Sequence, residues 1–201
     1  MALSNYDEMK TAIANWSDRA DLSAFIPDFI ALAEARYNRE LRLRSMEQKE
    51  HATTVGGQSN YALPVNYLQM REFRLNNNPT VSLTYVSPEI FEAWNLGSGV
   101  PKYYTIIANE IRIGPTPAGA YDMEMLFWRK FTPLSATNPV NWMITNSPDI
   151  YLYGALMEME PFVQNDARTQ LWAAGYYKAI ETLQLQDDKD RHSGSALTVN
   201  S

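Results

Sequence analysis

The hydrophobic period of this chain changes twice. Apolar residues recur at helical spacing before residue 45 and again after residue 147, whereas the residues between them form short alternating runs bounded by turn residues. A segment patterned for one period does not bury its apolar face in the other conformation. The pattern therefore predicts an α+β fold: mainly a helical bundle formed by the N- and C-terminal helices, with an inserted antiparallel β subdomain.

The helical segments have recognisable starts and stops. We expect long helices over about residues 5–16, 25–44, 147–162 and 166–185. Pro27 fits only the first turn of its helix, and Pro161 is expected to end or kink the helix that contains it. The dipeptides Ser87-Pro88 and Ser147-Pro148 both match a cap followed by a proline in the first turn, so a further short helix is expected after Ser87.

The central strands are predicted from turn residues. Gly56-Gly57 separates two short runs and predicts a hairpin of residues 47–55 with 60–63. A second hairpin is expected between residues 71–75 and 81–85, and a third between residues 103–107 and 110–113. A longer strand is expected over residues 121–130. The whole subdomain would contain six or seven strands.

These segments predict one domain. It would cover residues 1–187, with a helical body of residues 4–45 and 146–186 and the β subdomain inserted at about 46–131. The polar residues that follow Gln186, including Asp187, Asp188 and Arg191, predict a flexible tail over 188–201.

Composition excludes several classes of function. The net charge of -6 argues against a protein whose main task is to grip nucleic acid through its phosphates. The absence of Cys rules out disulfides, thiol catalysis and Cys-based metal sites. No apolar run approaches the length of a membrane span, and the first residues are polar, so we expect neither a membrane anchor nor a signal peptide.

Residues for catalysis are few. The two histidines, His51 and His192, stand in no metal-binding or catalytic motif, and Gly97-Ser98-Gly99 follows a helix as a stop and not as a phosphate loop. Glu158 and Glu160 are two apart on one helix and point to different faces. We therefore expect no cofactor, no metal and no enzymatic activity, with a peptidoglycan hydrolase that uses a single carboxylate kept as an alternative.

The densest basic run consists of Arg36, Arg39, Arg42 and Arg44. Such a run is typical of a nucleic-acid surface, of a solvated helix face paired with Glu34 and Glu40, or of an interface with acidic groups on another subunit. The acidic net charge favours the last two interpretations over DNA binding, and a nucleic-acid-binding module stays an alternative.

Three stretches resemble a known family. The first runs from Trp128-Arg129-Lys130-Phe131 through Pro133-Leu134-Ser135, Asn141-Trp142-Met143, Thr145-Asn146 and Pro148-Asp149 to Tyr151-Leu152-Tyr153-Gly154-Ala155-Leu156. The others are Ile26-Pro27-Asp28-Phe29-Ile30 with Ala33-Glu34-Ala35-Arg36, and Tyr61-Ala62-Leu63-Pro64 with Tyr67-Leu68. In this order and spacing they resemble the head-to-tail adaptor proteins of tailed phages, of the tail tubular protein A group.

The resemblance implies a structural virion protein. Such proteins assemble as rings, usually of twelve copies, between the portal protein and the tail or nozzle protein, and genomic DNA passes through the channel without specific binding. The expected location is the head-tail junction of the virion, after synthesis in the host cytoplasm. The C-terminal extension, here Asp187–Ser201, docks on the portal in related connectors. Our candidate interface residues are Arg36, Arg39, Arg42, Arg44, Trp142, Tyr151, Tyr153, Asp187, Asp188 and Arg191.

Overall fold

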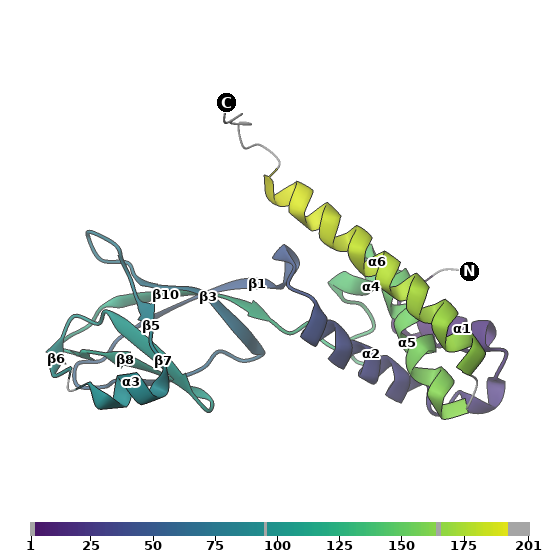
Figure 1. The fold of residues 1–201 in the computed structure, drawn as a ribbon, viewed down its shortest axis with the longest axis horizontal. Coiled ribbons are helices and arrows are strands. Elements are labelled where there is room, and N and C mark those ends of the chain that lie inside the picture. Colours follow the sequence, from purple (N-terminus) through teal and green to yellow (C-terminus); the bar gives the residue numbers. More distant parts are fainter. Residues whose placement is uncertain (1–2, 95, 164–165, 193–201) are drawn as a thin grey trace. The chain divides into compact units, whose positions relative to one another are not determined.

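The structure is a computed structural model that describes residues 3–192 apart from residues 95 and 164–165. Its mixture of helices and mainly antiparallel strands confirms the predicted α+β class (Figure 1). The chain divides into two compact units. The helical unit consists of Met1–Ser45 and Phe131–Ser201, and the β unit is Met46–Lys130.

The described residues of the helical unit form five α-helices. They are α1 (Tyr6–Ser17), α2 (Ile26–Glu40), α4 (Trp142–Asn146), α5 (Pro148–Val163) and α6 (Asp166–His192). Two short 3-10 turns, η1 and η2, occupy Ala20–Leu22 and Arg44–Met46. The short helix α4 is absent from the sequence-based prediction, which placed the first helix of this region at Ser147. Its start is marked by Asn141, whose side chain accepts a hydrogen bond from the Ile144 N–H.

Helix α5 forms the centre of this unit. It packs against α1, α2, α4 and α6 (Figure 1). Its buried residues point in every direction around the helix, as expected of a helix enclosed by others. They are Ile150, Tyr151, Leu152, Gly154, Ala155, Leu156, Met157, Met159 and Glu160.

Two helix ends differ from the prediction. Helix α2 ends at Glu40 and not at Arg44, because Leu41 adopts an extended conformation and Arg42 Nη1 donates to the exposed carbonyls of Asn38 and Leu41. Helix α6 extends to His192, so residues 188–192 belong to a helix and not to a flexible tail. The rest of the predicted tail lies outside the described residues.

Apart from residue 95, which the structure does not describe, the β unit holds ten strands and one short helix. The strands are β1 (Glu47–Thr53), β2 (Asn60–Ala62), β3 (Tyr67–Leu75), β4 (Val81–Ser82), β5 (Thr84–Tyr85), β6 (Ser98–Gly99), β7 (Tyr103–Ile107), β8 (Glu110–Gly114), β9 (Thr116–Pro117) and β10 (Asp122–Arg129). Two four-stranded sheets have the orders β1-β10-β3-β4 and β2-β8-β7-β5, and β6 pairs with β9. The helix α3 (Pro88–Ala93) begins at the proline expected to open it.

Two of the three predicted hairpins are present in the structure. The pairs β3-β4 and β7-β8 are antiparallel hairpins, as predicted. The hairpin predicted around Gly56-Gly57 is wrong, because β1 pairs with β10 and β2 pairs with β8. The sequence shows the turn but not the partner. The seven-residue register of β1 with β10 offers β1 many more backbone hydrogen bonds than the three residues of β2 could.

The β unit has one core between its two large sheets. One sheet contributes Phe73, Leu75, Met123, Met125 and Phe127, and the other contributes Tyr104, Ile111 and Ile113. Leu83, which lies in the chain between β4 of the first sheet and β5 of the second, completes this core. Alternate residues of β10 point into this core, and the other face of the strand carries Glu124 together with the half-buried Leu126 and Trp128.

Gly154 tests how tightly α5 is packed. A Cβ there would lie 2.6 Å from Tyr37 Oη, and Tyr37 is fully buried with its hydroxyl donating to the Ile150 carbonyl at 3.0 Å. We expect Gly154→Ala to lower the free energy of unfolding by about 1–3 kcal/mol in urea denaturation, despite the higher helix propensity of Ala.

Gly175 of α6 supplies the matched control. A Cβ there meets the ring of the half-buried Tyr153 at 3.3 Å, a contact that a small shift relieves. We expect Gly175→Ala to change stability by less than about 1 kcal/mol. Equal destabilisation by the two variants would contradict the close packing of α2 on α5.

Candidate interface of the helical unit

A buried carboxylate organises the helical unit. Glu34 of α2 is 8% exposed, and its Oε1 accepts hydrogen bonds from the Leu134 N–H at 2.7 Å and from the Tyr151 hydroxyl at 2.9 Å. Burial raises the pKa of Glu34, although both hydrogen bonds act in the opposite direction. Glu34 thereby joins α2 to α5 and to the segment that precedes α4.

Asn141 continues this network. Its Nδ2 donates to the Tyr151 hydroxyl at 2.6 Å and to the Thr132 carbonyl at 2.8 Å, while its Oδ1 caps α4. Both N–H groups and the carbonyl oxygen of the side-chain amide are therefore engaged in hydrogen bonds. The neighbouring Trp142 is 39% exposed and stacks on Phe131, with ring centroids 6.1 Å apart and an interplanar angle of 11°.

Tyr151 lies in the interior of this unit. Its side chain has no exposed surface, and its ring packs edge-on against Tyr37 at 5.2 Å. Burial, together with the nearby Glu34, raises the pKa of Tyr151, so its hydroxyl stays protonated and able to donate. Its assignment as an interface candidate is therefore corrected: the side chain holds the helices together and does not form part of the surface.

Arg36 makes a bridge between α2 and α5. Its guanidinium donates through Nε to Glu158 Oε1 at 2.7 Å and lies 3.7 Å from Glu40. Burial opposes the charged form of Arg36, but Glu158, followed by Glu40 and Tyr177, raises its pKa above the usual value. The expected pairing with Glu40 is present, whereas Glu34 is occupied by the buried network instead.

The other three arginines of the run have separate surroundings. Arg39 is exposed, and within the described part of the chain its side chain has no hydrogen bond or ion pair. Arg42 covers the end of α2, as described above. The backbone N–H of Arg44 donates to Asp187 Oδ1 at 3.1 Å, and its Nη1 donates to the Asp190 carbonyl at 2.7 Å. The four side chains therefore do not form one basic surface.

Hydrogen bonds join the C-terminal end of α6 to the segment that follows α2. Asp187 is partly buried and accepts from Arg44 and, at 3.2 Å, from Arg191 one turn later. Asp188 points away from this junction and is exposed. Asp187 and Arg191 are thus engaged within the unit, and Asp188 is the candidate of this group that stays available to a partner.

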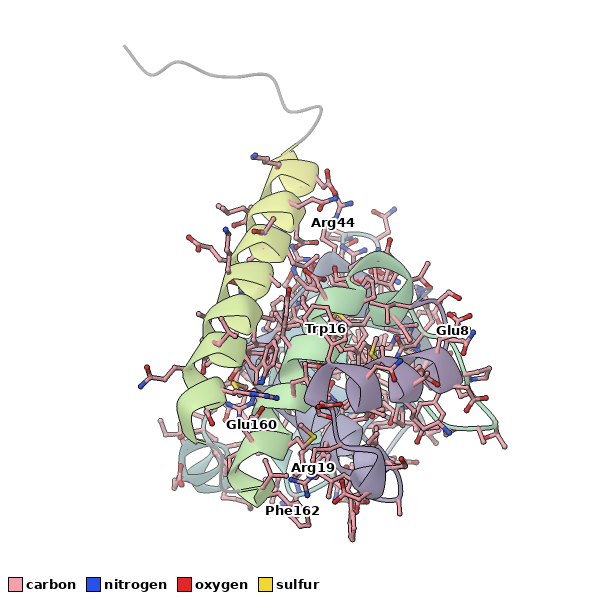
Figure 2. The ribbon with its side chains drawn as sticks, turned by 90° about the vertical axis from the view of Figure 1, so that its right-hand side faces the viewer. Glu8, Trp16, Arg19, Arg44, Glu160 and Phe162 are labelled. Carbon is pink, nitrogen blue, oxygen red and sulfur yellow. The ribbon has the colours of Figure 1, made fainter. Side chains whose placement is uncertain are left out.

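Tyr153 belongs to an aromatic cluster between α1, α5 and α6. Its ring lies 6.0 Å from Trp16 and 6.3 Å from Trp172, while Trp16 is 44% exposed. Glu160 is buried, and its Oε1 accepts a hydrogen bond from the indole N–H of Trp172 at 2.8 Å. Figure 2 shows Trp16 and Glu160 in the same helical unit, with Trp16 on α1 and Glu160 on α5.

The side chains considered for catalysis stay apart. Glu158 pairs with Arg36, and Glu160 bonds to Trp172. His51 lies in β1, 3.6 Å from Glu124 Oε2. Within residues 3–192, leaving out 95 and 164–165, no group of three or more His, Asp or Glu side chains could hold a metal ion.

The sequence matches the family described as SU10 adaptor protein over residues 4–199. This chain belongs to the SU10 adaptor protein family. Membership gives it the structural role of a phage adaptor and confirms that part of the resemblance, whereas the closer likeness to the tail tubular protein A group stays a prediction. No curated protein matches the sequence. In the described part of the adaptor, none of the helices combines the length and apolar character that crossing a bilayer requires.

Several key residues of the adaptor were missed by sequence reasoning. Glu34, Asn141 and Glu160 are polar side chains that the fold buries or half-buries at junctions between helices. Glu34 lies on the apolar face of α2, one residue after Ala33 and three before Tyr37, and this position was the available signal. The partners of Glu34 are 100 and 117 residues away in the chain. Asn141 bonds to the preceding loop, to α5 and to the undetected helix α4, and Glu160 bonds to the next helix, so these contacts depend on how the segments pack.

The raised pKa of Glu34 predicts a pH dependence of stability. Since the folded adaptor binds this proton more tightly than the unfolded chain, the free energy of unfolding falls as pH rises from the unfolded pKa through the raised folded pKa. Glu34→Gln keeps an oxygen that accepts from Leu134 and Tyr151 but cannot ionise. We expect the wild type to lose stability relative to Glu34→Gln over that pH range in urea denaturation.

Glu34→Ala is the control for the hydrogen bonds themselves. It leaves the Leu134 N–H and the Tyr151 hydroxyl without their acceptor at every pH. We therefore expect it to be about 1–3 kcal/mol less stable than Glu34→Gln, with the same difference throughout the pH range. A constant difference between wild type and Glu34→Gln across the pH range would show that Glu34 is not held in a desolvated site.

Proposed function

We propose that this adaptor forms a ring at the head-tail junction of a virion, between the portal protein and the tail or nozzle protein. The observation that carries the proposal is the match to an adaptor family over residues 4–199. The ring, usually of twelve copies in the proteins that the sequence resembles, would leave an axial channel for genomic DNA.

The charge of the chain fits this task. With a net charge of -6, the adaptor repels the phosphate backbone, so DNA can slide past it without being held. The basic run that favoured DNA binding is dispersed, since Arg36 pairs with Glu158 and Arg44 with Asp187. This arrangement supports passage of DNA over specific binding.

The fold fits an assembly protein in a second respect. A ring needs surfaces that contact neighbours while the subunit keeps its own structure. The helical unit has a closed interior around α5 and several large apolar side chains on its surface, including Trp16, Trp142 and Phe162. Aromatic side chains of this kind are enriched at protein interfaces.

Binding to the portal tests the proposal directly. Purified adaptor mixed with the portal protein of its phage should cosediment as a complex of fixed stoichiometry. Particles assembled without the adaptor should package DNA and then lose it. The proposal fails if no complex forms and tailed particles assemble without the adaptor. Clearing of purified peptidoglycan in a zymogram would instead support the hydrolase alternative.

The C-terminal segment is the part of the chain expected to dock on the portal. Removing residues 193–201 keeps every described contact between Arg44 and α6, so we expect an unchanged melting temperature and weaker cosedimentation with the portal. Removing 187–201 also deletes Asp187 and should lower the melting temperature as well. If the variant that lacks residues 193–201 binds the portal as well as the wild type does, these residues have no docking role.

A further inference from the structure

An apolar ridge runs along one side of the helical unit. Its exposed members are Phe25, Leu32, Phe162 and Tyr177, which are 43%, 50%, 55% and 51% exposed. Phe162 packs on Phe25 at 5.3 Å and, beneath it, on the buried Phe29 at 5.6 Å. Figure 2 shows Phe162 at one end of the unit.

The exposed members of the ridge lie around the bridge between Arg36 and Glu158. Leu32 lies one helical turn before Arg36 on α2, and Phe162 lies one turn after Glu158 on α5. Tyr177 of α6 lies close enough to Arg36 to raise its pKa. An arginine held at the centre of aromatic and aliphatic side chains is the composition of an energetically important interface.

A groove lies on the other side of α6. It has a volume of about 400 Å³ and is lined by Asp149, Tyr153, Gly175, Lys178, Thr182 and Leu183, among others. Gly175 faces the ring of Tyr153, whereas Tyr177, two residues later, points to the opposite side of the helix toward Arg36. One helix therefore separates a projecting apolar surface from a concave one.

Each of the two surfaces carries side chains of both charges. Asp28 and Arg39 lie on the same stripe of α2 as Leu32, four residues before it and seven after it. Asp149 and Lys178 line the groove. Within the described residues none of these four side chains has a hydrogen-bond or ion-pair partner.

We propose that the ridge of one copy of this adaptor docks in the groove of the next copy. Head-to-tail assembly requires two different surfaces on one chain that fit each other, and the ridge and the groove are such a pair. Binding of a portal protein would require only one surface on this chain, so it would not account for both. Arg39 of one copy then meets Asp149 of the next, which fixes the direction of assembly. This inference rests on the proposed ring.

Cross-linking tests the contact, and the chain is suited to it because it contains no Cys. Leu32→Cys and Thr182→Cys are prepared separately and together, bound to the portal protein and treated with a short bismaleimide. We expect the mixture of the two single variants to yield a cross-linked dimer, neither single variant alone to do so, and the double variant to give a ladder that ends in a closed ring. Asp7→Cys mixed with Thr182→Cys, which places one thiol on the exposed face of α1, should give only background cross-linking.

Charge reversal provides a second measurement. Arg39→Asp and Asp149→Arg should each reduce assembly on the portal at least tenfold, and the combined variant should recover it. Melting of each free variant checks that it is folded.

The outcomes separate the two proposals. If the Cys variants bind the portal as rings but Leu32 and Thr182 do not cross-link, and the combined charge variant assembles no better than the single ones, the ridge-to-groove contact is wrong and the adaptor role stands. If the wild type forms no complex with the portal, the proposed function fails and the contact fails with it.

Discussion

The helical unit depends on one buried carboxylate. Glu34 is placed on the apolar face of α2, where a charge is costly, and two hydrogen bonds from segments far away in the chain offset part of that cost. Through Leu134 and Tyr151 it connects the return from the β unit to the central helix. Asn141 extends the same network to the cap of α4, so the loop over residues 131–141 has a defined path without any regular structure of its own.

The rest of the unit follows from α5. Since this helix is enclosed, its neighbours bury much of their apolar stripes against it, and each does so with a different kind of contact. Arg36 and Phe29 of α2 meet Glu158 and Phe162, while Trp16 of α1 and Trp172 of α6 meet Tyr153. The large side chains left on the surface are the outer members of these same contacts. A ring subunit can use such positions because they are already held rigid by their inner neighbours.

The family to which this adaptor belongs has a structural role, and such a role is performed by surfaces. The carboxylates that drew attention as possible acids are occupied by Arg36 and Trp172, and the arginines that drew attention as a DNA surface are dispersed among separate contacts. What the helical unit offers instead is a set of exposed apolar side chains and a groove beside α6. This explains how a chain without a recognisable catalytic motif can have a specific role.

The sequence by itself determined the class of fold, the order of helices and strands, and the adaptor resemblance, because periodicity and capping are local properties. Helix starts at Pro88 and Pro148 and the hairpin of β7 with β8 were predicted for this reason. Only the tertiary structure decided that β1 pairs with β10, that Tyr151 is buried, and that α6 continues to His192. Each of these depends on a partner distant in the chain: a longer ladder for β1, the Glu34 carboxylate for Tyr151, and Arg44 for the end of α6. Local patterns contain no information on such partners, so the groove and ridge beside α6 became visible only once the helices were packed.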